Sequence, residues 1–168
     1  MSTVEKYNEN EQQEEFVGFR FHPTDQELVR YCLGRNKVAK TSNKVLELED
    51  KTDLYAKEPW RLTHTETDFF EPNEWYYFVT LAENVTGKLR TSRKVKGETC
   101  EGCWKEVLGK LSDVLSEDKR EVIGKKRSLS FYVKGESISS GWTMTEYYSR
   151  DGGSGSFQNQ VLCHLKGP

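Results

Sequence analysis

The clearest local signal in the chain is the stretch of residues 18–33, which reads GFRFHPTDQELVRYCL. Within it, Thr24 and Glu27 have the spacing of a capping box, in which the threonine hydroxyl accepts the backbone N–H of Glu27 and the glutamate carboxylate reaches back to the N–H of Thr24. Apolar residues then recur at helical spacing, and Gly34 offers a stop. The stretch therefore predicts that an extended, aromatic-rich arm, residues 16–21, leads into a short capped helix.

Length and composition indicate one domain with a polar surface. The chain has 168 residues, of which 35% are hydrophobic and 12% aromatic. This length suffices for a single core, and the aromatic share indicates a sheet with bulky faces. There is no run of about 18 apolar residues and no basic-then-apolar N-terminal pattern, so we expect neither a membrane span nor secretion.

Charge is segregated along the chain although the net charge is only −2. Residues 1–15 carry five glutamates against one lysine, a net of −4, and have little to bury, so we expect a disordered acidic tail followed by one domain over 16–168. Residues 85–134 carry thirteen basic against seven acidic side chains, a net of +6. Such asymmetry is what a phosphate-binding face needs, and it survives a near-neutral total.

Short apolar segments separated by turn signals predict a sheet. The strand over 75–81, WYYFVTL, is continuously apolar, so both of its faces should be covered, whereas 142–148 alternates. Further strands are expected at 104–108, 128–133 and 161–165, and helical turns at 24–33 and 53–60. The predicted fold class is α+β, a twisted, mostly antiparallel β-sheet with a few short helices packed at one end.

Four individual side chains can be assigned to core or solvent from their neighbours. Trp60 and Leu62 follow a predicted helical turn and should be core anchors. Trp104 should lie behind its strand, in the core or at a hinge. His64 stands in a threonine-rich polar stretch and should be exposed to solvent.

The four cysteines indicate a reducing compartment rather than a disulfide framework. Cys32 and Cys163 stand in apolar runs and should be buried thiols. Cys100 and Cys103 form a C-x-x-C, which is half of a structural zinc site, but no second pair of ligands has suitable spacing. We therefore expect no metal and no cofactor.

Sequence motifs of enzymes are missing. Neither a G-x-S-x-G, nor a Walker-type loop, nor a dinucleotide-binding glycine motif occurs. The three histidines, His22, His64 and His164, have no nucleophile or carboxylate at a telling spacing. The chain is thus predicted not to be an enzyme.

A basic run covers residues 88–96, KLRTSRKVK. A run of this kind is often only a solvated face. Its guanidinium, ammonium and hydroxyl groups are also the usual partners of DNA phosphates, so both interpretations stand on the residues alone.

Residues 18–33 resemble the opening motif of the NAC domain, a plant transcription-factor domain. Further blocks follow in the order of that family and at roughly its spacing. These blocks are 53–55 with 59–62, 75–78, 104–105, 124–132, 142–147 and 161–163. The resemblance covers almost the whole chain and implies a similar fold.

The resemblance also implies DNA binding. The family inserts a strand at the edge of its sheet into the major groove, with basic residues on either side contacting the phosphate backbone. The implied partner is double-stranded DNA with a CACG-type core, and the implied location is the nucleus. Carried over by position, the DNA-binding residues are Lys88, Arg90, Arg93, Lys94, Lys105, Lys126 and Arg127.

The reading strand departs from the family pattern. Where the family has Trp-Lys-Ala-Thr-Gly, this chain has WKEVLG over 104–109, which places Glu106 after the lysine. The segment between Arg93 and Trp104 is also several residues longer than is usual in the family, and it adds Glu98 and Glu101. A carboxylate repels phosphate, although it can accept a hydrogen bond from cytosine N4. Either the sequence preference has changed or DNA binding is weak.

The resemblance further implies a dimer, in which the N-terminal arm crosses to a second subunit and Arg20 pairs with Glu27 of that subunit. The implied interface consists of Phe16, Gly18, Phe19, Arg20 and Glu27. On the residues alone, the favoured interpretation is that Arg20 is an ordinary surface charge and that Glu27 merely completes the capping box.

An alternative function follows from the same features. The chain would be a dimerisation module that pairs with other NAC proteins, as homodimer or heterodimer, and binds DNA weakly or non-specifically. Family members usually carry a long regulatory region after the closing strand, whereas this sequence ends at Pro168. That end is expected either for such a module or for a shortened chain.

Overall fold

The structure is a computed structural model that describes most of the chain. The described residues are 20–30, 33, 38–40, 45–80, 82–83, 89–90, 94–95, 101–107, 111–149 and 160–168. The predicted acidic tail, residues 1–15, lies outside them.

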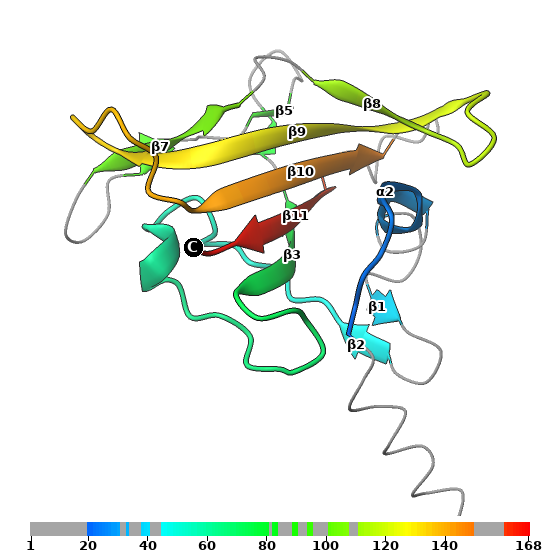
Figure 1. Cartoon of the computed structure of the whole chain (residues 1–168), viewed down its shortest axis with the longest axis horizontal. Helices are drawn as coiled ribbons and strands as arrows, with labels where there is room; N and C mark the ends of the chain where they lie inside the picture. Colours follow the sequence, from blue (N-terminus) through cyan, green and yellow to red (C-terminus); the bar gives the residue numbers. More distant parts are fainter. Residues whose placement is uncertain are drawn as a thin grey trace, which may run out of the picture.

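A seven-stranded antiparallel sheet dominates the fold (Figure 1). Its strands are β3 (Glu74–Thr80), β6 (Lys94–Val95), β7 (Gly102–Glu106), β8 (Ser112–Leu115), β9 (Val122–Val133), β10 (Thr143–Ser149) and β11 (Gln160–Lys166). The order is β3-β11-β10-β9-β7-β6, and β8 also pairs with β9. Two smaller pairs are formed by β1 (Val38–Lys40) with β2 (Val45–Glu47) and by β4 (Ala82–Glu83) with β5 (Leu89–Arg90). The predicted fold class, a twisted, mostly antiparallel sheet with a few short helices, is confirmed, and the described part of the chain contains much strand and little helix.

Strand β9 is the longest element of the sheet. It pairs with β10 on one side, and on the other side with β8 over its first half and β7 over its second half (Figure 1). The sequence predicted this strand only from residue 128, because the basic residues before that position break the apolar pattern. Cross-strand pairing with β8 and β10 extends it back to Val122.

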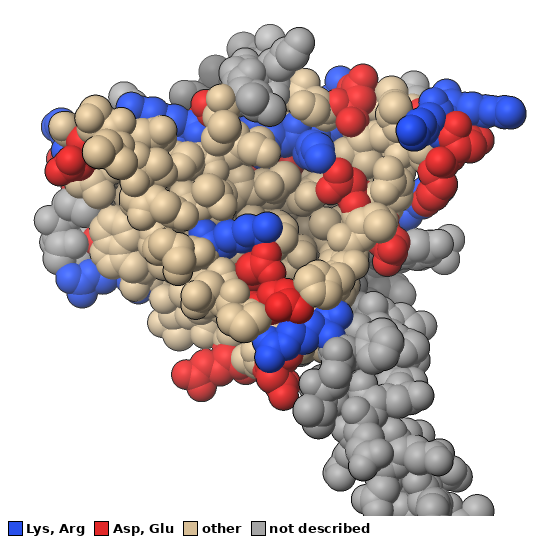
Figure 2. Space-filling view, viewed as in Figure 1, with Lys and Arg blue, Asp and Glu red and all other residues tan. Residues whose placement is uncertain are grey.

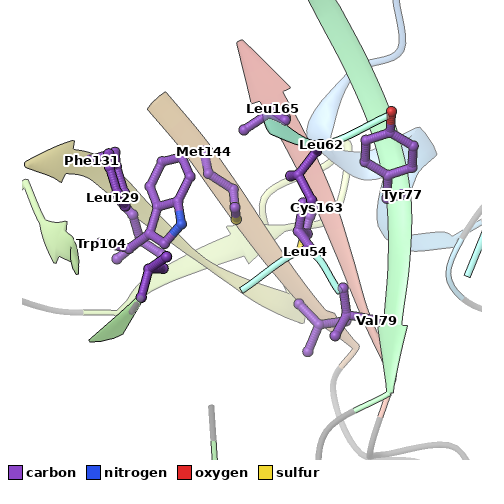
Figure 3. Close-up of a cluster of buried hydrophobic side chains, with 12 residues drawn as sticks. Leu54, Leu62, Tyr77, Val79, Trp104, Leu129, Phe131, Met144, Cys163 and Leu165 are labelled. Carbon is purple, nitrogen blue, oxygen red and sulfur yellow. The ribbon is translucent and has the colours of Figure 1, made fainter. Parts of the chain in front are cut away.

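Both faces of the sheet are buried, each under a separate hydrophobic cluster. The first cluster includes Phe21, Leu28, Val29, Phe69, Phe70, Tyr76, Phe78, Val114, Tyr147 and Leu162. The second cluster, shown in Figure 3, includes Leu54, Leu62, Tyr77, Val79, Trp104, Leu129, Phe131, Met144, Cys163 and Leu165. Because side chains alternate along a strand, β3 supplies residues to both clusters, which confirms the prediction that its two faces are covered.

Two side chains in the segment after Leu54 differ from expectation, Trp60 and His64. The 3₁₀ helix η2 (Pro59–Arg61) begins at the proline, and it turns Trp60 outward, with 39% of its surface exposed and its ring edge-on to Phe131. Leu62 fills the core as predicted. The core assignment of Trp60 was therefore wrong, because a single helical turn cannot bury both side chains.

His64 was also assigned wrongly, since it is half-buried rather than exposed. Its ring stacks on Trp75 at 4.1 Å between centroids, Nδ1 lies 2.9 Å from the Tyr77 hydroxyl, and Nε2 lies 2.8 Å from the carbonyl of Pro59. Burial is the main cause that lowers the pKa of His64. The polar neighbours in the sequence gave no sign of these aromatic partners, which come from the sheet.

Strand β10 alternates as predicted, but one residue of its buried face is charged. Met144 and Glu146 face the second cluster, and Glu146 is fully buried. The hydroxyl of Tyr55 donates a hydrogen bond to Glu146 Oε2, and that of Tyr148 donates to Oε1 at 2.9 Å. These two donors satisfy a carboxylate that would otherwise be costly to bury.

The short helix α2 (Asp25–Glu27) begins at the predicted cap. The backbone N–H of Glu27 donates to Thr24 Oγ1 at 3.1 Å, and the threonine hydroxyl donates to Glu27 Oε1 at 3.3 Å. The helical turn then buries Leu28 and Val29 under the sheet. Of the predicted extended arm, the described part hydrogen-bonds from Phe21 N to the carbonyl of Phe69 at 2.8 Å.

We predict that Gly124→Ala destabilises the domain. A Cβ atom at this position would lie 2.5 Å from the carbonyl oxygen of Tyr148 and 2.9 Å from Val29 Cγ1, so either β10 or the helical turn must shift. The expected cost is about 1–3 kcal/mol, measured by urea unfolding. Ser128→Ala, at an exposed position of the same strand, is the control and should change stability little. Equal unfolding midpoints for the two variants would contradict the close packing.

We also predict that stability falls as the pH is lowered from about 6.5 to about 4. Burial lowers the pKa of His164 to about 4, with Lys166 adding to the effect and Glu74 opposing it. A histidine in the unfolded chain has a pKa near 6.5, so between these values the unfolded state binds more protons and is favoured. Urea titrations across this range should show a smaller loss for His164→Gln than for the parent chain. Parallel pH profiles would show that His164 does not contribute.

Candidate DNA interface

Strand β7 carries the lysine that the sequence predicted at the centre of the DNA-binding surface. All five residues of β7 pair with β9, whereas β6 pairs only with Gly102 and Cys103. Among the described residues, no strand pairs with the other side of 104–106. Within the described part of the chain, this half of β7 is therefore an edge of the sheet.

The alternation of β7 separates its core residue from its exposed one. Trp104 is buried, as predicted, with its ring 5.2 Å from that of Phe131. Lys105 points to the opposite face and is exposed. Its ammonium lies 4.8 Å from the ring centroid of Tyr132, a cation–π contact that orients the side chain without neutralising it.

The glycine of the C-x-x-C has a packing role. A Cβ atom on Gly102 would lie 2.5 Å from Phe131 Cζ and 2.7 Å from the carbonyl oxygen of Tyr132, so only glycine allows β7 to approach β9 here. Cys103 is a free, partly exposed thiol that borders a cavity of about 470 Å³. In the described part of the chain, no group of three or more metal-binding side chains occurs.

Glu106 faces a cation of its own chain. Its Oε1 atom lies 2.9 Å from Nε of Arg127 on β9, and the two side chains are only 29% and 23% exposed. The acidic departure in the reading strand is therefore compensated within the domain. Arg127, predicted to contact DNA, is held by this ion pair.

Lys126 is engaged with the helix α2. Its ammonium lies 2.6 Å from Asp25 Oδ2, and the hydroxyl of Tyr147 donates to Oδ1 of the same carboxylate at 2.7 Å. Burial would raise the pKa of Asp25, but the hydrogen bonds from Lys126 and Tyr147 and the lysine charge outweigh it and keep the pKa below its usual value. Lys126 thus docks the helix on the sheet, a role that the sequence did not reveal.

Basic and acidic side chains are interspersed over this part of the surface. On the face shown in Figure 2, lysines and arginines over β7, β8 and β9 stand beside aspartates and glutamates, including at the tip of the β8–β9 hairpin. The net positive charge of the segment is therefore not gathered into one uniform basic patch on this face.

The remaining predicted DNA-binding residues precede β7 in the sequence. Arg90 and Lys94 lie in β5 and β6, of which the structure describes the backbone. Lys88 and Arg93 lie outside the described residues.

Arg20 and Glu27, the predicted partners across the dimer, each bond to another residue within one chain. Arg20 donates from Nη1 to the carbonyl oxygen of Phe70 at 3.1 Å, and Glu27 belongs to the helix cap. Phe16, Gly18 and Phe19 lie outside the described residues.

No helix of the described part is long and apolar enough to cross a membrane.

Comparison with known proteins agrees with this arrangement of motifs. The family model described as "No apical meristem (NAM) protein" matches residues 16–149. The chain is similar to NAC domain-containing proteins 37 and 76 of Arabidopsis thaliana, each 41% identical over 135 residues, which is 77% of this chain and 34% and 33% of those proteins. It is 37% identical over 134 residues to Protein CUP-SHAPED COTYLEDON 1 of the same plant, covering 77% of this chain and 40% of that protein.

The chain thus spans between about a third and two fifths of the length of these relatives. The family model, in contrast, covers most of the chain, from the N-terminal arm to the end of β10. With this coverage and relatives of about 40% identity, the chain belongs to the NAC domain family, whose members are plant transcription factors and not enzymes.

Proposed function

We propose that this domain binds double-stranded DNA in a sequence-specific manner, as a dimer and in the nucleus, with the edge of β7 in the major groove. The observation that carries the proposal is the exposed ammonium of Lys105 on an edge strand. Among the described residues no carboxylate pairs with it, so its charge is available to a DNA base or phosphate. A β-element fits the width of the major groove, where each base pair presents a distinct donor and acceptor pattern.

The surroundings of Lys105 suit this role. Trp104 and Phe131 hold β7 against the second cluster from behind, so the edge is presented on a rigid support. The ring of Tyr132 restricts the lysine side chain, which lowers the entropy lost when it contacts DNA. Residues on β5 and β6, among them Arg90 and Lys94, precede this strand in the sequence and would supply phosphate contacts.

The proposed specificity is tested by titrating a duplex with a CACG-type core beside a scrambled duplex, at low and near-physiological salt. Preference for the core that persists at the higher salt supports a sequence-specific factor. Equal and salt-sensitive binding to both duplexes would leave only electrostatic attraction to the backbone. Absence of binding to either would refute the proposal.

A second candidate function is a dimerisation module that pairs with other NAC proteins and binds DNA weakly. The ion pairs of Lys126 with Asp25 and of Arg127 with Glu106 favour it, because they occupy two of the proposed phosphate contacts. Equal, weak binding in the titration together with a stable dimer would support this candidate.

We predict that Lys105→Ala weakens duplex binding several-fold. If Lys105 contacts a phosphate, its loss should also reduce the slope of log K against log salt by about one unit. If Lys105 contacts a base, the affinity should fall without this change in slope. The measurement is a fluorescence anisotropy titration at several salt concentrations. Lys57→Ala is the matched control, since Lys57 lies near η2 and pairs with Asp53 at 3.8 Å. Equal effects of the two substitutions would remove Lys105 from the interface.

We also predict that Arg20→Glu shifts the protein towards monomer. The proposed partner of Arg20 is Glu27 of a second subunit, and the two residues are not paired within one chain. Mass in solution is measured by analytical ultracentrifugation. The charge-swapped variant, Arg20→Glu with Glu27→Arg, should recover the dimer. A single variant that remains dimeric, or a swap that does not restore the dimer, would exclude this pair from the interface.

A further inference from the structure

Three consecutive basic residues of β9 are each paired with a carboxylate from a different element. Lys125 lies 2.9 Å from Asp113 of β8, Lys126 lies 2.6 Å from Asp25 of α2, and Arg127 lies 2.9 Å from Glu106 of β7. Because successive residues of a strand point to opposite faces, this stretch is neutralised on both sides of the sheet.

These pairs differ in how far solvent reaches them. The side chains of the Lys125 pair are both 49% exposed, and those of the Lys126 pair 37% and 32%. The Arg127 and Glu106 side chains are 23% and 29% exposed, so their attraction is the least screened by water and salt. Glu106 is therefore the partner that competes most strongly with an incoming anion.

Glu106 is next to the proposed reading residue in the sequence, but its side chain points to the opposite face of β7, the face of Trp104. It follows Lys105 on the edge of β7, and Arg127 lies on the neighbouring strand, where Glu106 pairs in register with Leu129. Among the described residues, a DNA phosphate that approaches this edge meets the available ammonium of Lys105 on one face, and on the other face it meets Arg127, which is already held by a carboxylate.

We propose that the Glu106 carboxylate competes with DNA phosphate for Arg127. By holding Arg127 out of contact with DNA, Glu106 lowers both the affinity for DNA and the dependence of that affinity on salt. The inference rests on the proposed function and identifies, among the described residues, one that lowers the affinity of this surface. Arg127 contributes to DNA binding only when it exchanges the carboxylate for a phosphate. No covalent step is involved, and the exchange replaces one ion pair by another.

The test is Glu106→Gln, which removes the charge and nearly preserves the size of the side chain. We expect the variant to bind the CACG-type duplex about fivefold more tightly than the parent chain or better, with a salt slope steeper by about one unit, because Arg127 then releases counterions from DNA. Glu66→Gln, at an exposed position of the loop before β3, is the matched control for the change in net charge. It should leave both quantities near their parent values.

A second background shows whether Arg127 carries the effect. In the Arg127→Gln chain, Glu106→Gln should give a clearly smaller gain in affinity than in the parent chain and no steeper salt slope, because only the direct repulsion between Glu106 and phosphate is then removed. An unchanged or weaker affinity of Glu106→Gln in a parent chain that binds DNA would overturn the inference and leave the proposed function standing. Equal gains for Glu106→Gln and Glu66→Gln would overturn it as well, since net charge alone would then explain the effect. If neither the parent chain nor the Glu106 variant binds duplex, both proposals fail.

Discussion

The constraint on which this fold depends is that one sheet must bury both of its faces. A strand alternates its side chains, so β3 can serve two hydrophobic clusters only because its residues 76–79 are apolar throughout. The arm, α2 and the loop after Leu62 cover one face, and the segment from Leu54 to Leu62 covers the other. Because Trp104 of β7 packs into the second cluster, the edge of the sheet at β7 is fixed to the hydrophobic core.

The same alternation distributes the charges of β9. Its basic residues occur consecutively, so they point to both faces, and each face brings a different acidic partner. Asp25 arrives with the helix, and Glu106 arrives with β7. Two of the residues expected to face DNA therefore have structural roles within the domain. This leaves Lys105, oriented by an aromatic ring and not by a carboxylate, as the available cation of the described edge.

The local pattern predicted much of the fold and less of the site. The capping box at Thr24, the strands around 75–81 and 142–148, and the burial of Cys163 follow from spacing and periodicity, which are properties of neighbouring residues. Trp60 and His64 were assigned wrongly because their environment depends on residues of the sheet that are far away in the sequence. The buried carboxylate of Glu146 escaped notice for the same reason, since its donors include a tyrosine from another segment.

By itself the sequence determined the fold class and membership of the NAC family, because hydrophobic period, capping and motif order are written along the chain. Tertiary structure alone decided which charges meet. The pairs of Arg127 with Glu106 and of Lys126 with Asp25 depend on strand register and on where the helix docks. Register is set by the packing of whole faces against two cores, and no short stretch of sequence specifies it.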